Sequence, residues 1–268
     1  MKVAALQMVS GTSVQGNLDT ASMLIRQAAE AGAQLAVLPE YFCLMGHKDS
    51  DKLTVREAPG AGPVQEFLAA SAREHGLWLA GGTMPLQGSD NDHVRNTSLV
   101  FTPQGEAVAR YDKIHLFRYD NGTEQYDESR VIERGAQPAA FDMTARDGRR
   151  WRIGMSVCYD LRFPELYRSL GADVLLVPSA FTYGTGKAHW ELLLRARAVE
   201  NLAFVIAAAQ GGMHENGRRT WGHSMVIDPW GVVLAQQAEG AGVVLADLDA
   251  ARQAQVRAQL PALEHRVL

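Results

Sequence analysis

The chain has 268 residues, of which 47% are hydrophobic, so it can bury a large core and does not have the composition of a disordered protein. Its 26 Lys and Arg against 30 Asp and Glu give a net charge of -4 without a long run of one sign, which argues against nucleic acid and anionic membranes as partners. The apolar N-terminal stretch is too short for a signal sequence or a membrane span, so we expect a cytoplasmic protein.

The first part of the chain alternates between apolar strands and amphipathic helices. Asn17 is the expected N-cap of the first helix and Gly32 its stop. A second helix is expected at residues 63–75, and strands are expected at residues 2–8, 34–38, 77–84, 96–101 and 107–111. The last two strands should pair antiparallel through a turn at residues 103–105.

A second, similar set follows a polar stretch at residues 118–138. We expect helices at residues 164–170 and 187–202, and strands at residues 151–157, 173–177, 203–209, 224–227, 232–235 and 243–247. Residues 34–40 and 173–179 are alike, since both form a strand that ends at Pro and a polar residue. The near-continuous apolar strands predict an α/β fold buried on both sheet faces, and without a linker we expect a single domain over residues 1–268. The helix-like tail, broken at Pro261, is expected to pack on a neighbouring chain.

Two cysteines without a secretory signal make a disulfide framework improbable, so each thiol needs its own explanation. Cys158 lies between a strand and a helix that Pro164 is suited to begin. Such an elbow raises a side chain above the sheet edge, near backbone N–H groups that favour a thiolate and can hold an oxyanion. The alternative is an ordinary buried cysteine, which is also the interpretation that we give Cys43.

Three charged residues are candidates to act with this thiol. Glu40 follows Pro39 among aromatic neighbours, where burial raises the pKa of a carboxyl toward that of a general base; the alternative is a surface loop. Lys113 is either a solvated charge at a strand edge or a buried ammonium that stabilises an oxyanion. Glu128 lies in so polar a stretch that a solvated loop is the simpler interpretation.

Other motifs predict little chemistry. The histidines include no His-x-x-x-His pair, so we expect no metal site, and His115, His189 and His223 are interpreted as hydrogen-bonded structural residues. The Gly-Gly pairs at residues 81–82 and 211–212 lack the spacing of a phosphate loop. Three aromatic residues are expected either to line a pocket or simply to pack, namely Phe117, Phe181 and Tyr183.

Several segments resemble the signatures of the nitrilase (carbon–nitrogen hydrolase) superfamily, in its chain order. Residues 38–40, 111–117 and 156–165 resemble the Glu, Lys and Cys motifs, and residues 189–201 and 221–231 resemble the Nit branch of amidases. The resemblance implies a four-layer αββα sandwich of two pseudo-repeated halves, a homodimer or higher homo-oligomer, and no metal or organic cofactor.

The resemblance also assigns roles by position. Cys158 corresponds to the nucleophile, Glu40 to the general base, and Lys113 to the oxyanion stabiliser, while Glu128 corresponds to a glutamate that orients the lysine and the leaving group. The backbone N–H of Tyr159 is expected to complete the oxyanion site. Arg162 either binds a substrate carboxylate or forms a structural salt bridge to Glu165 or Asp160.

The expected activity is hydrolysis of the amide of a small carboxylate-bearing substrate to acid and ammonia through a thioester. Residues 208–215 with 221–224 are more similar to deaminated glutathione amidases than to ω-amidases of short keto acid amides, which stay an alternative. A nitrilase and an N-carbamoyl amidohydrolase are further alternatives that use the same residues. A relative that has lost catalysis and serves as a binding subunit is the alternative outside enzymes.

Overall fold

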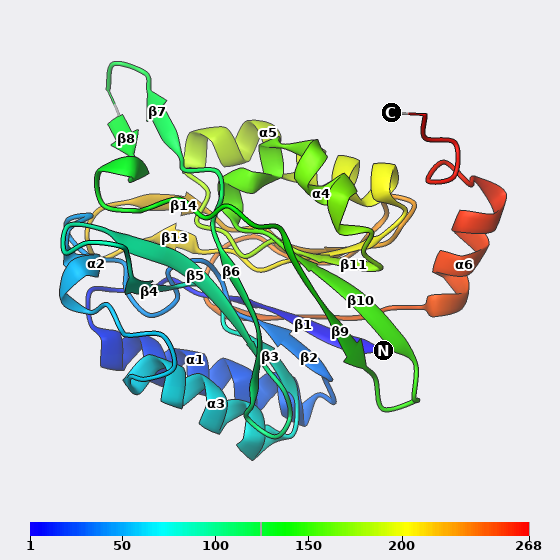
Figure 1. Ribbon diagram of the computed structural model, residues 1–268, viewed down its shortest axis with the longest axis horizontal. Coiled ribbons are helices and arrows are strands. Elements are labelled where there is room, and N and C mark those ends of the chain that lie inside the picture. Colours follow the sequence, from blue (N-terminus) through cyan, green and yellow to red (C-terminus); the bar gives the residue numbers. More distant parts are fainter. Residues whose placement is uncertain (124, 268) are drawn as a thin grey trace.

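Two β-sheets lie face to face between two layers of helices in this computed structural model, which describes residues 1–123 and 125–267 (Figure 1). Helices α1 (Val14–Glu30) and α3 (Pro63–His75) cover the outer face of one sheet, and α4 (Pro164–Leu170) and α5 (Tyr183–Asn201) cover the other. The predicted αββα sandwich is therefore confirmed.

The first sheet is built mainly by the N-terminal part of the chain. Its strands in spatial order are β17 (Gly242–Asp247), β1 (Lys2–Gln7), β2 (Leu35–Val37), β3 (Trp78–Ala80), β5 (Val94–Phe101) and β4 (Met84–Gln87), with β6 (Ala107–Asp112) on β5. Strands β1, β2 and β3 are parallel and almost wholly buried. We predicted that residues 243–247 complete the second set of strands, and this was wrong, because β17 pairs antiparallel with β1.

The second sheet repeats the parallel core of the first. Its strands in spatial order are β16 (Val233–Gln237), β15 (Ser224–Ile227), β12 (Phe204–Ala207), β11 (Val174–Leu176), β10 (Arg150–Met155) and β9 (Ala139–Thr144). Strands β10, β11 and β12 are parallel, like β1 to β3. Buried side chains of both sheets, including Val37 and Ile153, belong to one hydrophobic cluster. The carboxyl ends of the two parallel sets therefore lie above a shared core.

Two local predictions in the first half were wrong. Helix α1 begins earlier than expected, with Ser13 as its N-cap, because Asn17 lies inside the helix and donates hydrogen bonds to Gly11 O and Cys43 O. The single strand expected at residues 77–84 is two strands, since the chain turns at Gly82 with a φ of 53°. A Cβ on Gly82 would lie 2.1 Å from Pro39 O, so only glycine permits this approach to the chain that leads to Glu40.

Helix α5 begins four residues before the expected start at 187. Glycines in its first turn argue against a helix by propensity, but Gly186 packs against Trp221, where a Cβ would lie 2.3 Å from Trp221 Cβ. The tail prediction was also wrong, because α6 (Ala250–Gln259) is bound to its own chain. Gln253 is buried and donates to Asp173 O and Leu202 O.

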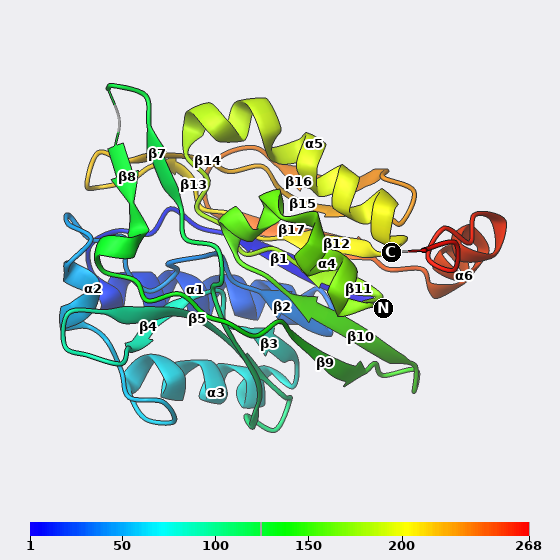
Figure 2. The same cartoon turned by 45° about the horizontal axis from the view of Figure 1, so that its top comes forward.

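Shorter elements gather at one end of the molecule in both Figure 1 and Figure 2. They are the hairpins β7 (Arg118–Asp120) with β8 (Gln125–Asp127) and β13 (Gly211–Met213) with β14 (Arg219–Trp221), and the helix α2 (Asp51–Thr54). The β7–β8 hairpin belongs to the polar stretch predicted at residues 118–138. Glu124 of that stretch and Leu268 of the tail lie outside the described residues.

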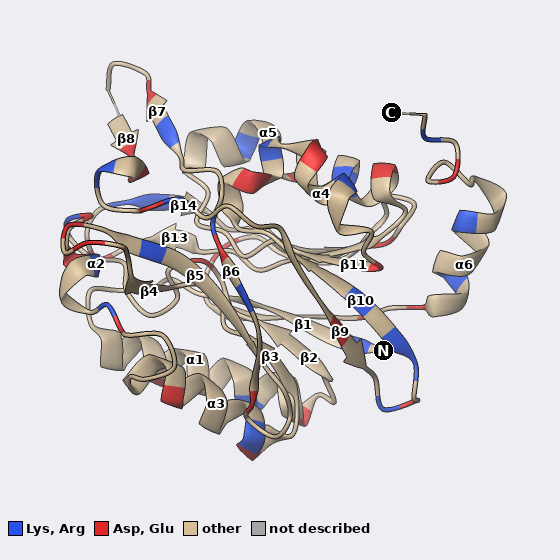
Figure 3. Ribbon diagram, viewed as in Figure 1, with Lys and Arg blue, Asp and Glu red and all other residues tan. Residues whose placement is uncertain are grey.

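Charged residues of both signs are dispersed over the ribbon (Figure 3). No described helix combines the length and the apolar composition that crossing a membrane requires.

Candidate active site

Cys158 stands at the elbow that the sequence predicted. Strand β10 ends at Met155, and Cys158 begins a 3-10 helix (Cys158–Arg162) that leads into α4. Its φ of 50° is in the left-handed region, which a residue with a side chain occupies only when its surroundings hold it there. The N–H of Cys158 donates to Pro178 O at 3.0 Å, and its side chain is buried. The thiol is thus held in a fixed position beyond the edge of the second sheet.

Asp160 holds this elbow from below. Its carboxylate is fully buried and accepts hydrogen bonds from Val157 N at 2.8 Å and from the Tyr111 hydroxyl at 2.7 Å. It also lies 2.7 Å from His115 Nδ1, which agrees with the structural role predicted for that histidine. The sequence suggests Asp160 only as a possible salt-bridge partner of Arg162. Its place in the Cys motif was the available signal for a positioning role.

Glu40 follows β2 and is buried, so the surface alternative is excluded. Its Oε1 accepts hydrogen bonds from Lys113 Nζ and from Asn96 Nδ2, each at 2.9 Å. Its Oε2 accepts from Ala180 N at 2.9 Å. Donors from both halves of the chain therefore fix this carboxylate, and Asn96 is a contributor that the sequence reading missed.

Lys113 is also buried, which excludes the solvated alternative. Besides Glu40, its ammonium pairs with Glu128, with Nζ to Oε2 at 2.8 Å. Glu128 in turn accepts hydrogen bonds from the Tyr41 hydroxyl and from Phe117 N, each at 2.7 Å. Glu128 is therefore not a solvated loop residue. Tyr41, which follows Glu40 in the chain, is thus a contributor that no sequence motif predicted.

The site shifts the pKa values of its ionisable groups in opposite directions. Burial raises the pKa of the Cys158 thiol, and the Glu40 carboxylate raises it further, although Lys113 opposes this. Burial disfavours the Lys113 cation, but Glu128 and Glu40 outweigh it and raise the pKa of the ammonium. Burial also disfavours the charged form of Glu128 and would raise its pKa, yet the Lys113 cation outweighs this and brings the pKa below the usual value. At neutral pH the site thus holds a neutral thiol beside a permanent cation.

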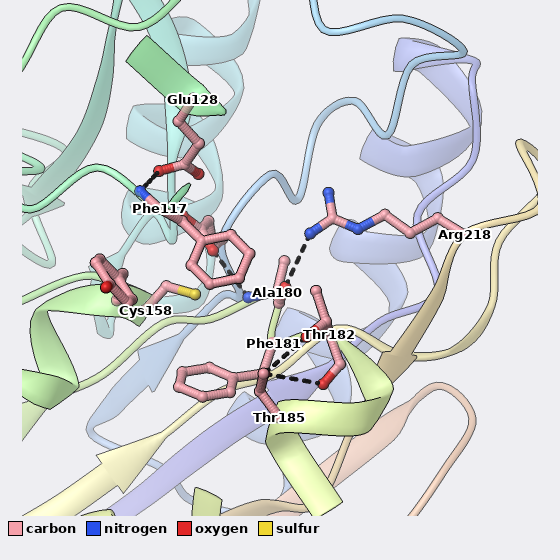
Figure 4. A pocket seen from close by; sticks show the side chains of 10 residues that line it. Phe117, Glu128, Cys158, Ala180, Phe181, Thr182, Thr185 and Arg218 are labelled. Carbon is pink, nitrogen blue, oxygen red and sulfur yellow. Dashed lines mark hydrogen bonds between the residues drawn. The ribbon is translucent and has the colours of Figure 1, made fainter. Parts of the chain in front are cut away.

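The pocket above these groups is shown in Figure 4. Glu40, Glu128 and Cys158 line it together with the predicted residues Phe117, Tyr159 and Phe181. Tyr159 is the second residue of its 3-10 helix, so its N–H has no partner within that helix. Arg162 is not among the lining residues, and its Nη2 lies 3.2 Å from His189 Nδ1.

Arg218 lines the pocket instead, on the side opposite Cys158 (Figure 4). Its Nη2 donates to Ala180 O at 3.2 Å. No sequence pattern pointed to Arg218, because it precedes β14 in a polar segment that is typical of an exposed turn. Among the described residues, no group of three or more His, Cys, Asp or Glu side chains could hold a metal ion.

Comparison with known proteins identifies the class that this fold and site define. The carbon–nitrogen hydrolase family model matches residues 2–258, and the chain belongs to this family. It is an amidase of the nitrilase superfamily, as the sequence motifs predicted.

Individual relatives narrow the class. The chain is 41% identical to a deaminated glutathione amidase of Synechocystis sp. over 98% of this chain and 97% of that protein. Nit3 of Saccharomyces cerevisiae, a member of branch 10 of the nitrilase superfamily, is 29% identical, with a TM-score of 0.87 over 100% of this chain and 97% of the other. A mutant amidase from Nesterenkonia sp. AN1, with acrylamide added at its active-site cysteine, is 28% identical, with a TM-score of 0.79 over 97% and 98% of the two chains.

Proposed function

We propose that the chain hydrolyses deaminated glutathione and that Cys158 is its nucleophile. The observation that carries the assignment of the site is that the buried Cys158 lines one pocket with Glu40, whose carboxylate pairs with the buried Lys113 at 2.9 Å. The substrate is supported by the relative of the same name that matches almost the whole chain.

Glu40 is proposed as the general base. The raised pKa of Cys158 keeps the thiol protonated, so attack on an amide needs a base at the moment of reaction. Glu40 takes the thiol proton, the sulfur bonds to the amide carbon, and Lys113 with the Tyr159 N–H stabilises the oxyanion. Glu128 holds the Lys113 ammonium in place through their ion pair.

The same carboxyl completes the reaction. Glu40 gives its proton to the amide nitrogen as the carbon–nitrogen bond breaks, which leaves a thioester on Cys158. Water then attacks the thioester, Glu40 takes a proton from it, and the proton returns to the sulfur as the carbon–sulfur bond breaks. A primary amide releases ammonia, whereas deaminated glutathione carries cysteinylglycine on the amide nitrogen and releases that dipeptide.

Other residues at or near the pocket are proposed to contact the substrate. Phe117 and Phe181 are proposed as apolar walls for the acyl chain. Arg162 stays a candidate for carboxylate binding, and its contact with His189 is the competing structural use.

A substrate panel tests the proposal. Wild-type enzyme is offered deaminated glutathione, α-ketoglutaramate, a nitrile and an N-carbamoyl amino acid, and intact mass is recorded during turnover. We expect the highest kcat/KM for deaminated glutathione and a mass increase on Cys158 that is absent in Cys158→Ala. The proposal fails if none of the compounds is hydrolysed, and the substrate assignment alone fails if another compound is clearly preferred.

We further propose one domain, a homodimer and a cytoplasmic location. A single domain is supported because Glu40 and Cys158 come from different halves of the chain. Dimerisation is supported by large apolar side chains exposed on α5 and near the β15–β16 turn, among them Leu192, Val199 and Trp230. A reducing compartment suits two free cysteines. Sedimentation at micromolar concentration tests the dimer, since a monomer contradicts it.

A further inference from the structure

A second hollow of about 460 Å³ lies beside the catalytic pocket, and we call it the outer hollow. Residues from three separate segments line it, including Tyr41, Met45, Lys48, Lys52, Tyr126 and Arg218. Its volume is within the range of small-ligand sites. Among the described lining residues, Arg218 alone is shared by the outer hollow and the catalytic pocket. A ligand that reaches from one to the other therefore passes this side chain.

Arg218 is held in place while part of its hydrogen-bonding capacity stays unused. Its Nη2 donates to Ala180 O, its Nη1 lies 4.0 Å from Met45 Sδ, and its guanidinium carbon lies 5.4 Å from the centre of the Tyr126 ring. Its Nε is buried and has no hydrogen-bond partner among the described residues. None of these neighbours carries a negative charge, so the guanidinium has no described anion of its own.

The outer hollow is also cationic. Among the described residues that line it, Lys48, Lys52 and Arg218 face one carboxylate, that of Asp49, which pairs with Lys52 at 3.0 Å. Lys52 Nζ stands 4.8 Å from the centre of the Tyr41 ring, and Tyr41 in turn donates to Glu128. The hollow thus offers an anion site and aromatic surface directly beside the catalytic carboxylates.

We propose that the outer hollow binds the peptide leaving group of an N-substituted amide, and that Arg218 binds that group's carboxylate. The inference rests on the proposed function, since it places the cysteinylglycine part of deaminated glutathione in the outer hollow. Planar guanidinium donors match a carboxylate in a bidentate manner, and the burial of Arg218 Nε strengthens such a pair. A primary amide has no group that reaches the outer hollow, so Arg218 distinguishes the two kinds of substrate.

The test compares how removing the arginine from the protein and removing the carboxylate from the substrate affect hydrolysis. Wild type and Arg218→Met are each assayed with deaminated glutathione, with its glycinamide analogue that lacks the terminal carboxylate, and with α-ketoglutaramate. We expect Arg218→Met to lower kcat/KM for deaminated glutathione by roughly 30-fold or more, chiefly through KM. The loss for α-ketoglutaramate should be at least ten times smaller. Wild type should hydrolyse the glycinamide analogue with a low kcat/KM, and Arg218→Met should lower that value only slightly further.

Controls separate binding from damage to the fold. Arg218→Lys keeps the charge without the planar fork and should recover part of the loss. Arg219→Met removes the neighbouring arginine, which pairs with Glu239 at the surface, and should leave all three substrates unaffected. Equal losses for deaminated glutathione and α-ketoglutaramate in Arg218→Met overturn the inference while the proposed function stands. Wild type that hydrolyses neither compound overturns the proposed function itself.

Discussion

The two halves of the molecule share a framework but contribute different chemistry to the site. Strands β1 to β3 and β10 to β12 are both parallel sets under helices, and in each half the second strand is followed by Pro. After Pro39 comes Glu40, whose side chain meets Lys113. After Pro178 comes Ser179, whose hydroxyl donates to Val177 O within its own segment.

The nucleophile comes from a different position of the repeat. Cys158 follows β10, the first strand of its parallel set, whereas Glu40 follows β2, the second strand of the other. Both turns use a left-handed backbone, at Cys158 and at Tyr41, with φ of 50° and 57°. The repeated framework thus provides two equivalent sheet edges. The site forms where the end of the second parallel strand of one sheet meets the end of the first parallel strand of the other.

The largest expected effect is on kcat, and it comes from replacing Glu40, the residue after the first of the two prolines. Glu40→Gln removes the proposed base while keeping the shape, and kcat should fall by roughly 10²- to 10⁴-fold. Ser179→Ala, its counterpart in the other half, should change kcat less than about threefold, because the lost hydrogen bond is worth only about 1 kcal/mol of stability. Steady-state kinetics with deaminated glutathione measure both, and similar losses would argue against the division of roles.

The next largest effect is expected for Lys113→Met. It leaves the buried Glu40 and the partly buried Glu128 without their cation, so the free energy of unfolding should fall by about 3–5 kcal/mol. Arg110→Met, which breaks an exposed pair with Asp112 on the same strand, should cost less than about 1 kcal/mol. Denaturant titration compares the two, and equal costs would contradict the proposed burial of the catalytic charges.

A smaller effect is expected from loosening the turns themselves. Asp160→Asn weakens several hydrogen bonds to a buried carboxylate beneath Cys158 and should destabilise the protein by about 2–3 kcal/mol. Thr83→Ala removes the hydroxyl that accepts from Tyr41 N in the other half, at a cost of about 1 kcal/mol. Thermal unfolding of the two variants tests the order, and a reversed order would mean that the elbow does not depend on Asp160.

The smallest effect concerns a contact that joins the halves. His214 lies between Ser10 O and Thr220 Oγ1, and burial lowers its pKa below the usual 6.5. The unfolded chain therefore binds a proton at higher pH than the folded one. The stability that neutral His214 contributes is complete above pH 6.5 and is lost as pH falls toward its folded-state pKa.

The measurement is the difference in unfolding free energy between wild type and His214→Gln at pH 7.5 and 5.5. This difference should shrink at the lower pH, by at most about 1.4 kcal/mol per pH unit. A difference independent of pH would show that His214 does not titrate with folding.

Residues whose role depends on neighbours in sequence could be predicted, and those whose role depends on distant segments could not. The Cys158 elbow was visible because strand, cysteine and Pro164 lie within one short segment. Lys113 could be interpreted only through the family resemblance, since its partners Glu40 and Glu128 come from other elements. Arg218 had no signal, because its surroundings combine Ala180 with Tyr126 and Met45.

The layered fold followed the same rule. Apolar runs and helix periodicity predicted an α/β fold with strands buried on both faces, because each strand and helix carries its own pattern. The four-layer sandwich itself was predicted only through the family resemblance. The pairing of β17 with β1 was missed, since nothing local distinguishes a strand that stays in its own half from one that crosses to the other.

That crossing strand constrains how the protein can be made. During synthesis β1 leaves the ribosome before all the other strands of this fold and β17 after them, so the outer edge of β1 stays unpaired while the strands between the two are made. An unpaired apolar edge is a template for pairing with other chains. Deleting the chain from residue 242 onward therefore removes the protection of this edge, and the shortened protein should aggregate rather than fold with a slightly smaller sheet.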